Sequence, residues 1–348
     1  MPYSFKNDYA EGAHERIIEA LTRTNRVQAD AYGMDEYCNA ARALITKRLG
    51  RNDCDIHFMT GGTQTNLIVL AAALRPYQGA LCAATGHINV HEAGAIEMTG
   101  HKALPLPSPD GKITAGQARK AFTSHYQDAS IEHLVQPGLL YISQPTEIGT
   151  LYSKAELTAL RAVCDEFGAI LFADGARLGS ALTAEGADAT LADMARLCDC
   201  FYIGGTKMGA LCGEALVIRN ERIKEGFRYV QTQHGAMIAK SRLIGVQFMT
   251  LFTDGLYEEL ASYANAEAKK LRVGLEKRGC DFLIPTVTNQ IFPILPKKLV
   301  EKLADRYALT YWEPYDEERD VMRMCTSWAT DDAAVEAFLR DFTAETDA

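Results

Sequence analysis

The sequence predicts an α/β protein: a large domain with a mostly parallel sheet, followed by a smaller C-terminal α+β domain. Short apolar runs alternate with helical patterns up to about residue 237, as in a parallel sheet covered by helices. Beyond that point long helices dominate. The 348 residues also exceed the roughly 250 to 300 at which one hydrophobic core stops growing. We therefore expect domains at 1–245, which includes an N-terminal arm, and 246–348.

The apolar runs in the first domain have the length and composition of buried strands. They span residues 56–59, 80–84, 138–142, 169–173, 200–203 and 214–218. The clearest helical patterns between them cover residues 65–74 and 153–166. Ser153 lies three residues before Glu156, which is a capping box and marks a helix start. Ligands of such a sheet are expected beyond the carboxyl ends of its strands.

The second part of the chain has a different pattern of predicted helices and apolar runs. Helical patterns cover residues 237–252 and 256–278, and a final acidic helix closes the sequence. Three short apolar runs separate them, at 281–284, 290–294 and 321–325. This mixture predicts the smaller α+β domain.

Composition narrows the class of function. Hydrophobic residues make up 47% and charged residues 23% of the chain, as is usual for a soluble protein. No apolar run approaches the roughly 20 residues of a membrane span, and the start lacks a signal peptide, so we expect a cytoplasmic protein without membrane contact. The net charge of −9 comes from interspersed acids and bases, which argues against nucleic acid and favours a small-molecule partner.

Nine cysteines are scattered along the chain without C-x-x-C spacing. Several lie within apolar runs, so they are expected to be reduced core residues and not disulfides. Only Cys198 and Cys200 are close together, and one intervening residue is a poor spacing for metal ligands. We expect no metal site.

Lys207 lies in an apolar, glycine-rich stretch at residues 201–213. A buried amine loses its proton easily, and a neutral amine attacks aldehydes, so Lys207 is a candidate for a Schiff base. The alternative is an ordinary loop lysine whose stem covers apolar surface while its amine reaches water.

Residues 60–66, Thr-Gly-Gly-Thr-Gln-Thr-Asn, follow the first predicted strand and lead into an apolar helix. A glycine turn between strand and helix directs free backbone N–H groups at a phosphate, with the helix dipole in support. Thr63 and Gln64 add side-chain donors. A plain helix cap at Thr63 is an equally good interpretation.

Two further strands end in polar side chains. Asp174 can pair with a pyridinium N–H, or it can cap the next helix. Arg177, three residues on, can bind a carboxylate or lie at the surface. His87 can stack on a flat ring or carry protons, or it is a core histidine. Together, a phosphate turn, a ring-facing histidine, a group for a ring nitrogen and an aldehyde-trapping lysine describe a site for pyridoxal 5′-phosphate.

At these positions the chain closely resembles the low-specificity L-threonine aldolases, which are β-eliminating lyases of the aspartate-aminotransferase-like superfamily and pyridoxal-phosphate fold type I. The matching segments are residues 32–35, 61–66, His87 with 92–94, 173–178, 204–211, 213–215, 288–292 and 321–328. The resemblance covers nearly the whole chain. It implies retro-aldol cleavage of L-threonine, L-allo-threonine or phenylserine to glycine and an aldehyde.

The resemblance also implies roles for individual residues. Lys207 holds the cofactor covalently, Asp174 pairs with the pyridine nitrogen, and His87 stacks on the ring. Gly62, Thr63 and Thr206 bind the phosphate. Asn7, Arg177 and Arg323 grip the substrate carboxylate, with Arg177 also counted in the cofactor site. Lys240 or Arg242 reaches the phosphate of a neighbouring subunit, because these enzymes build their sites at a dimer interface, in homodimers or homotetramers.

One departure concerns the catalytic base. Many aldolases of this group carry a Glu-Asn-Thr-His pattern after the strand at 138–142, whereas residues 143–149 here include Glu147 at about that place. His87 is the first candidate base, ahead of Glu147 and Glu92. β-Elimination or racemisation on the same scaffold, and a non-catalytic binding protein, are the alternatives.

Overall fold

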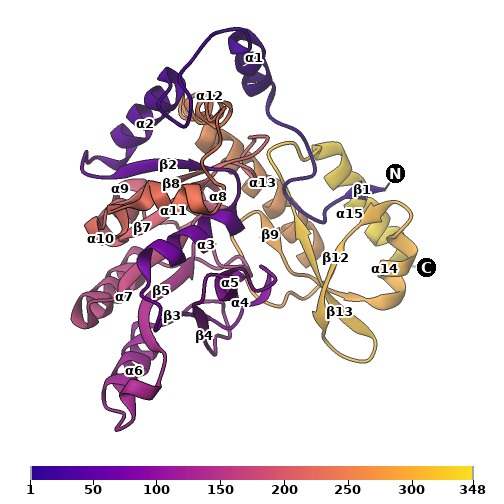
Figure 1. Cartoon of the computed structure of the whole chain (residues 1–348). Coiled ribbons are helices and arrows are strands. Elements are labelled where there is room, and N and C mark those ends of the chain that lie inside the picture. Colours follow the sequence, from indigo (N-terminus) through magenta and orange to yellow (C-terminus); the bar gives the residue numbers. More distant parts are fainter. Residues whose placement is uncertain (1, 347–348) are drawn as a thin grey trace.

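A seven-stranded sheet forms the centre of the computed structural model, which describes residues 2–346 (Figure 1). The strand order is β2-β8-β7-β6-β5-β3-β4. Strand β8 is antiparallel to β2 and β7, and all other neighbours are parallel. The predicted α/β class and its mostly parallel sheet are confirmed.

Six strands of the sheet coincide with predicted apolar runs, and β4 is the one that prediction missed. The strands are β2 (Asp55–Met59), β3 (Gln78–Ala83), β4 (Lys102–Leu106), β5 (Gln136–Ser143), β6 (Ile170–Asp174), β7 (Cys200–Gly204) and β8 (Glu214–Ile218). β4 lies at the sheet edge, is only partly buried and contains Pro105, so it lacks an apolar run.

Helices cover both faces of this sheet (Figure 1). Alternate residues of each strand enter different cores: in β7, Phe201 and Ile203 pack with one set of helices and Tyr202 with the other. The helices of the large part are α1 (Glu15–Thr24), α2 (Glu36–Leu49), α3 (Gly62–Ala73), α4 (His87–Val90), α5 (Ala95–Met98), α6 (Ala115–Tyr126), α7 (Lys154–Phe167), α8 (Leu178–Leu182), α9 (Leu191–Leu197), α10 (Glu221–Lys224), α11 (Phe227–Gln233) and α12 (Arg242–Leu251). A short 3-10 helix spans Ile131–His133.

Two helix boundaries test the sequence patterns. The capping box of Ser153 and Glu156 starts α7 as predicted. The prediction of a helix from residue 237 is wrong, because α12 begins only at Arg242. The preceding residues form a turn that is hydrogen-bonded to the segment before α2. Tyr32 N–H donates to the Ala239 carbonyl at 3.2 Å, and Gly33 N–H donates to the Ser241 hydroxyl.

The C-terminal part combines long helices with a small antiparallel sheet. It contains α13 (Leu256–Glu276), β9 (Gln290–Ile291), β10 (Ile294–Pro296), α14 (Lys297–Leu303), β11 (Tyr307–Ala308), β12 (Thr310–Pro314), β13 (Arg319–Cys325) and α15 (Asp332–Thr346). The order is β10-β13-β12, and β9 also pairs with β13. The apolar run at 281–284 forms no strand, and only one bridge, from Phe282 to Pro293, forms there. Pro293 also separates β9 from β10, because proline has no N–H to donate.

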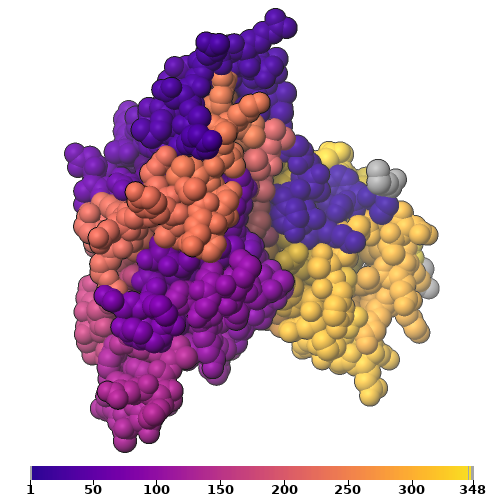
Figure 2. Space-filling view, viewed as in Figure 1, coloured from indigo at the N-terminus to yellow at the C-terminus, as the bar shows by residue number. Residues whose placement is uncertain are grey.

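The N-terminal arm lies against the C-terminal part (Figure 2). Strand β1 (Tyr3–Ser4) pairs with β11, and the Phe5 carbonyl accepts from Cys325 N–H at 2.8 Å. The expected boundary at 245/246 falls inside α12, which packs on α1 and α2. The division into two domains stays a prediction.

The nine cysteines are all free, and six of them are buried. Within residues 2–346, no helix combines the length and the apolar character that a membrane crossing requires.

Candidate active site

A cleft opens at the carboxyl ends of the parallel strands. It consists of two adjoining cavities of about 310 and 640 Å³. The smaller one is lined by the turn at 60–63, Asp174, Thr206 and Glu214, and the larger one by residues of β12 and by Arg323. Five residues line both cavities: Tyr9, His87, Glu147, Arg177 and Lys207. The topology thus gathers most of the predicted site residues in one place.

Helix α3 starts in the smaller cavity without a side-chain cap. Gly61 occupies the cap position, and the N–H groups of residues 62–64 donate to no acceptor within residues 2–346. Gln64 turns back, since its Oε1 accepts from the Thr60 hydroxyl at 2.6 Å. Free N–H groups and the helix dipole make this end of the cavity suited to an anion such as phosphate.

Asp174, at the end of β6, is 5% exposed and held on both oxygens. Its Oδ1 accepts from Ala176 N–H at 3.0 Å, and its Oδ2 accepts from the Tyr141 hydroxyl at 2.6 Å and from Asn66 Nδ2 at 3.1 Å. Burial raises the pKa of this carboxyl, but the charge of His87 and the hydrogen bond from Tyr141 lower it below its usual value overall. The cavity therefore presents a fixed negative charge.

His87 follows β3 and is oriented by a buried acid. Its Nδ1 lies 2.7 Å from Glu92 Oε1, which also accepts from Asn66 Nδ2 at 2.7 Å. Burial lowers the pKa of His87, but Glu92 and Asp174 raise it above its usual value overall. Because Glu92 is engaged with the ring, it is a partner of His87 and not a free base.

Glu147 lies beside His87 on the loop after β5. Its Oε1 accepts from the Ser143 hydroxyl at 2.6 Å and from the backbone N–H of His87 at 2.9 Å. Burial raises its pKa, against the lowering by the Ser143 hydrogen bond. Glu147 and His87 are thus adjacent proton-carrying groups at the junction of the two cavities.

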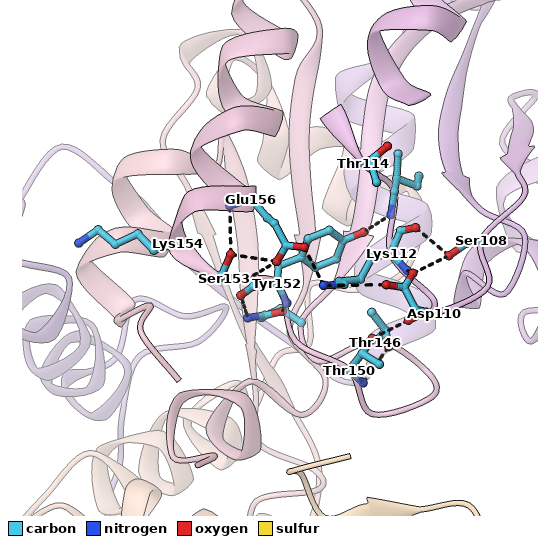
Figure 3. A network of polar contacts seen from close by, with 12 residues as sticks. Ser108, Asp110, Lys112, Thr114, Thr146, Thr150, Tyr152, Ser153, Lys154 and Glu156 are labelled. Atoms are coloured by element: carbon cyan, nitrogen blue, oxygen red, sulfur yellow. Dashed lines mark hydrogen bonds and ion pairs between the residues drawn. The ribbon is translucent and has the colours of Figure 1, made fainter. Parts of the chain in front are cut away.

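The loop that carries Glu147 is anchored by a polar network (Figure 3). The Thr150 hydroxyl donates to the Asp110 carbonyl at 2.6 Å. Lys112 forms an ion pair of 2.7 Å with Glu156, the acid of the α7 capping box. The loop is therefore tied to the segments that start α6 and α7, which limits the movement of Glu147.

Lys207 follows β7 and reaches the junction of the two cavities. Burial and the nearby Arg177 lower the pKa of its amine, while Asp8 and Asp174 act in the opposite direction. Its Nζ lies 5.8 Å from the centre of the Tyr9 ring. No salt bridge joins the amine to an acid within the part of the chain that the structure describes. A lowered pKa is the property that the chemistry of an aldehyde-trapping lysine requires.

Arg177 has a partner that the sequence did not predict. Its Nε and Nη2 donate to the two carboxylate oxygens of Asp8 at 2.6 and 3.0 Å. Asp8 is fully buried and also accepts from Asn289 Nδ2 at 2.8 Å. Burial raises the pKa of Asp8, yet the charges of Arg177 and Lys207 lower it to about 2 overall. Only the Nη1 side of Arg177 is left for a ligand.

Of the remaining predicted residues, one lies in the cleft and the others line neither of its two cavities. Arg323 lines the larger cavity, and its buried Nε has no partner within residues 2–346. Asn7 lines neither cavity, and its Oδ1 accepts from Tyr9 N–H at 3.1 Å. Arg242 bonds to the carbonyls of Thr24 and Val27 in its own chain, whereas exposed Lys240 has no such side-chain partner among the described residues.

Sequence reasoning missed Asp8 and Glu214. Glu214 lines the smaller cavity, where its Oε1 accepts from the Thr206 hydroxyl at 3.0 Å. An acid that opens a buried strand was a usable signal for Glu214. No local pattern marks Asp8, whose partner lies 169 residues away.

Comparisons with known proteins agree with this geometry. The sequence profile of the beta-eliminating lyase family matches residues 8–297. The low specificity L-threonine aldolase of Pseudomonas aeruginosa is 30% identical over 340 residues, 97% of this chain and 96% of that protein. The structure of Leishmania major threonine aldolase superposes with a TM-score of 0.96 at 44% identity, covering 99% of each chain. Thermus thermophilus aspartate aminotransferase shares the fold alone, with a TM-score of 0.72 at 14% identity over 99% of this chain and 91% of that one.

Proposed function

Because the chain belongs to the beta-eliminating lyase family, we propose that it is a pyridoxal 5′-phosphate-dependent aldehyde-lyase. It cleaves the Cα–Cβ bond of β-hydroxy-α-amino acids, namely L-threonine, L-allo-threonine or phenylserine, to glycine and an aldehyde. The observation that carries this proposal is the pairing, in one cavity, of a lysine with a lowered pKa and a buried, ionised aspartate, beside an uncapped helix start. Full-length similarity to low specificity L-threonine aldolases supports the reaction.

The residues present fit the cofactor. The free N–H groups of Gly62 and Thr63 suit its phosphate, the Asp174 carboxylate suits its ring nitrogen, and Lys207 suits a covalent bond to its aldehyde. His87 lines the same cavity and suits a place against the ring. When bound, the cofactor supplies an electron sink for the pair left on Cα when the bond breaks.

Substrate orientation falls to two arginines. The Nη1 edge of Arg177 and the guanidinium of Arg323, which lines the larger cavity, are donors for the substrate carboxylate. Holding the carboxylate would fix which bond at Cα is oriented for cleavage when the cofactor is bound. The larger cavity, with Trp312 and His91 on its wall, has room for an aryl side chain.

We assign proton transfer to His87, with Glu147 as the second candidate. Glu92 fixes Nδ1 of His87, so Nε2 is the atom that takes the β-hydroxyl proton, directly or through water, as the aldehyde departs. A proton returned to Cα completes glycine, so atoms and charge balance without any further reactant. The hydrogen bond with Glu92 suits this role, because it raises the pKa of His87 against the effect of burial.

We place the protein in the cytoplasm as a homodimer or homotetramer, with its sites at the dimer interface. Lys240 of a second copy then reaches the phosphate. Lys240 is preferred to Arg242 because it is exposed and uncommitted within its own chain.

The test is an aldehyde-release assay on purified, cofactor-loaded protein with threonine diastereomers and phenylserine. Glycine and aldehyde in equal amounts are expected, and Lys207→Ala should reduce release to background. Pyruvate and ammonia without aldehyde would select β-elimination instead, and loss of optical activity alone would select racemisation. Borohydride reduction followed by mass measurement of the Lys207 peptide reports the covalent bond independently of turnover, and an unmodified peptide would favour a binding protein.

A further inference from the structure

Glu214 places an acid at the end of the cleft where we locate the phosphate. It is 4% exposed and lines the smaller cavity together with the turn at 61–63. The sheet explains this position: β8 alone runs against the other strands, so its first residue lies at the edge where they end. Register pairs Glu214 with Met59 on one side and Gly204 on the other.

The surroundings disfavour a charged Glu214 once phosphate is bound. A phosphate ester carries nearly two negative charges at neutral pH. The charged groups that act on Glu214 are Lys207 and Asp174, and the phenols of Tyr202 and Tyr257 also lie within its electrostatic reach. Lys207 is the proposed partner of the aldehyde, and Asp174 is itself negative. Within residues 2–346, no lysine or arginine forms an ion pair with Glu214.

The hydrogen bonds available to the Thr206 hydroxyl give a second argument for a protonated Glu214. A threonine hydroxyl has one hydrogen and two lone pairs. Oγ1 of Thr206 accepts from Gly213 N–H at 3.0 Å and donates to Glu214 Oε1 at 3.0 Å, while Glu214 Oε2 accepts from Gly205 N–H at 3.0 Å. An ionised Glu214 can only accept, so it holds the one hydrogen of Thr206. A proton on Oε1 reverses this bond and frees the Thr206 hydrogen for a phosphate.

We propose that Glu214 carries a proton whenever the cofactor phosphate is bound, and that this proton turns the Thr206 hydroxyl from Glu214 to the phosphate. The inference rests on the cofactor proposed above and gives Glu214 a role in binding, with no part in bond cleavage. Within one chain, the phosphate site then consists of the α3 start, the Thr206 hydroxyl and a neutral Glu214, to which the proposed dimer adds Lys240 of a second copy.

The proposal makes phosphate affinity depend on pH. Burial raises the pKa of Glu214 to about 8, against the lowering by Lys207. Below that pH Glu214 already holds its proton, so the affinity is constant with respect to this group. Above it the proton must be taken up on binding, and the dissociation constant rises about tenfold per pH unit.

The experiment uses pyridoxine 5′-phosphate, whose alcohol cannot bond to Lys207, and protein freed of its cofactor. Titration calorimetry between about pH 7 and 10 should give wild-type affinities that fall above about pH 8. Glu214→Gln should remove the part of that fall that comes from Glu214, because the amide is neutral and still donates. Pyridoxine, which lacks the phosphate, should show the same pH dependence with both proteins. Lys207 titrates in both, so the difference between their curves isolates Glu214.

Each outcome decides a separate point. Equal slopes for wild type and Glu214→Gln would overturn the role of Glu214 and leave the cofactor proposal standing. Failure of the wild type to bind pyridoxine 5′-phosphate would overturn the cofactor proposal itself.

Thr206→Val keeps the inference testable if Glu214→Gln does not fold. Its loss of affinity should be largest below about pH 8 and should shrink above it, because valine removes the hydrogen bond that lowers the pKa of Glu214, so the variant loses less affinity when the proton must be taken up on binding. A loss that is constant with pH would contradict the hydroxyl turn. In the loaded wild type, the infrared carbonyl band of a protonated acid should be present at neutral pH, and it should be missing in Glu214→Gln.

Discussion

At the residue scale, the site depends on acids that act through other side chains. Asp8 holds Arg177, and Glu92 holds His87. Both acids are buried, so their charges act at low dielectric and their removal leaves a partner without its counter-charge. The two pairs lead to different predictions, because one concerns binding and stability and the other concerns proton transfer.

Asp8→Asn should raise KM for the amino acid more than it lowers kcat, since Arg177 loses the group that orients it. Breaking a buried ion pair should also lower the free energy of unfolding by about 3 to 5 kcal/mol. Kinetics and denaturant unfolding at neutral pH test both effects. Glu11→Gln, an exposed acid on the same arm, is the matched control and should change neither.

The pH dependence of stability gives a second check on Asp8. Its folded pKa of about 2 lies below the ordinary value of an aspartate, so its contribution is fully present above that ordinary value. The contribution is lost as pH falls from about 4 toward 2. The stability difference between wild type and Asp8→Asn should shrink over this interval. A constant difference would mean that the charge of Asp8 is not what stabilises the fold.

Glu92→Gln should move the pH profile of the reaction. Glu92 raises the pKa of His87, so its neutralisation should lower that pKa. A base acts when unprotonated, and the rising limb of kcat/KM against pH should therefore shift to lower pH. Glu97→Gln, an exposed acid of the next helix, should leave the limb in place. If the rising limb of kcat/KM does not shift in Glu92→Gln, the base is a group other than His87, and Glu147 is the next candidate.

At the element scale, the turns after β6 and β7 bring Asp174 and Lys207 together. Gly204 N–H donates to the Gly175 carbonyl at 2.9 Å, so the two turns touch backbone to backbone. A Cβ on Gly175 would lie 1.8 Å from the Tyr202 carbonyl oxygen. Glycine is required here by close approach and not by an unusual φ.

Gly175→Ala should therefore destabilise the protein by about 3 kcal/mol or more, because backbone must move to relieve the contact. Thermal unfolding measures the loss. Gly116→Ala is the control, since a Cβ there, within α6, would meet nothing closer than 3.9 Å. That change should be neutral or stabilising by up to about 1 kcal/mol. Similar melting temperatures for the two variants would contradict the backbone contact.

Sequence patterns predict structural features that depend on residues close together in the chain. The strands of the sheet were predictable because buried parallel strands are continuous apolar runs, and Asp174 and His87 were identifiable because each follows such a run. Asp8 was not, because its contacts with Arg177 and Asn289 depend on how distant segments meet. Glu214 was overlooked because it begins a strand, and only the antiparallel direction of β8 brings a strand start to the site.

At the scale of the whole molecule, the proposed dimer makes each site depend on two chains. If Lys240 serves the partner's phosphate, then Lys207→Ala and Lys240→Ala should each be inactive or weakly active alone. Mixing and reassociating them should restore about a quarter of wild-type activity, because half of the dimers are hybrids with one intact site. Sedimentation establishes the oligomeric state. No recovery on mixing would place the action of Lys240 within its own subunit.

The arm that delivers Asp8 also bears on how the protein is made. β1 pairs with β11, the Phe5 carbonyl accepts from Cys325, and Asp8 accepts from Asn289. A nascent chain that already contains Lys207 therefore still lacks the contacts that hold the arm and keep Asp8 against Arg177. Those contacts form only after the last third of the polypeptide has left the ribosome, since domains emerge N-terminus first. The site therefore depends on residues that are synthesised well after both Asp8 and Lys207.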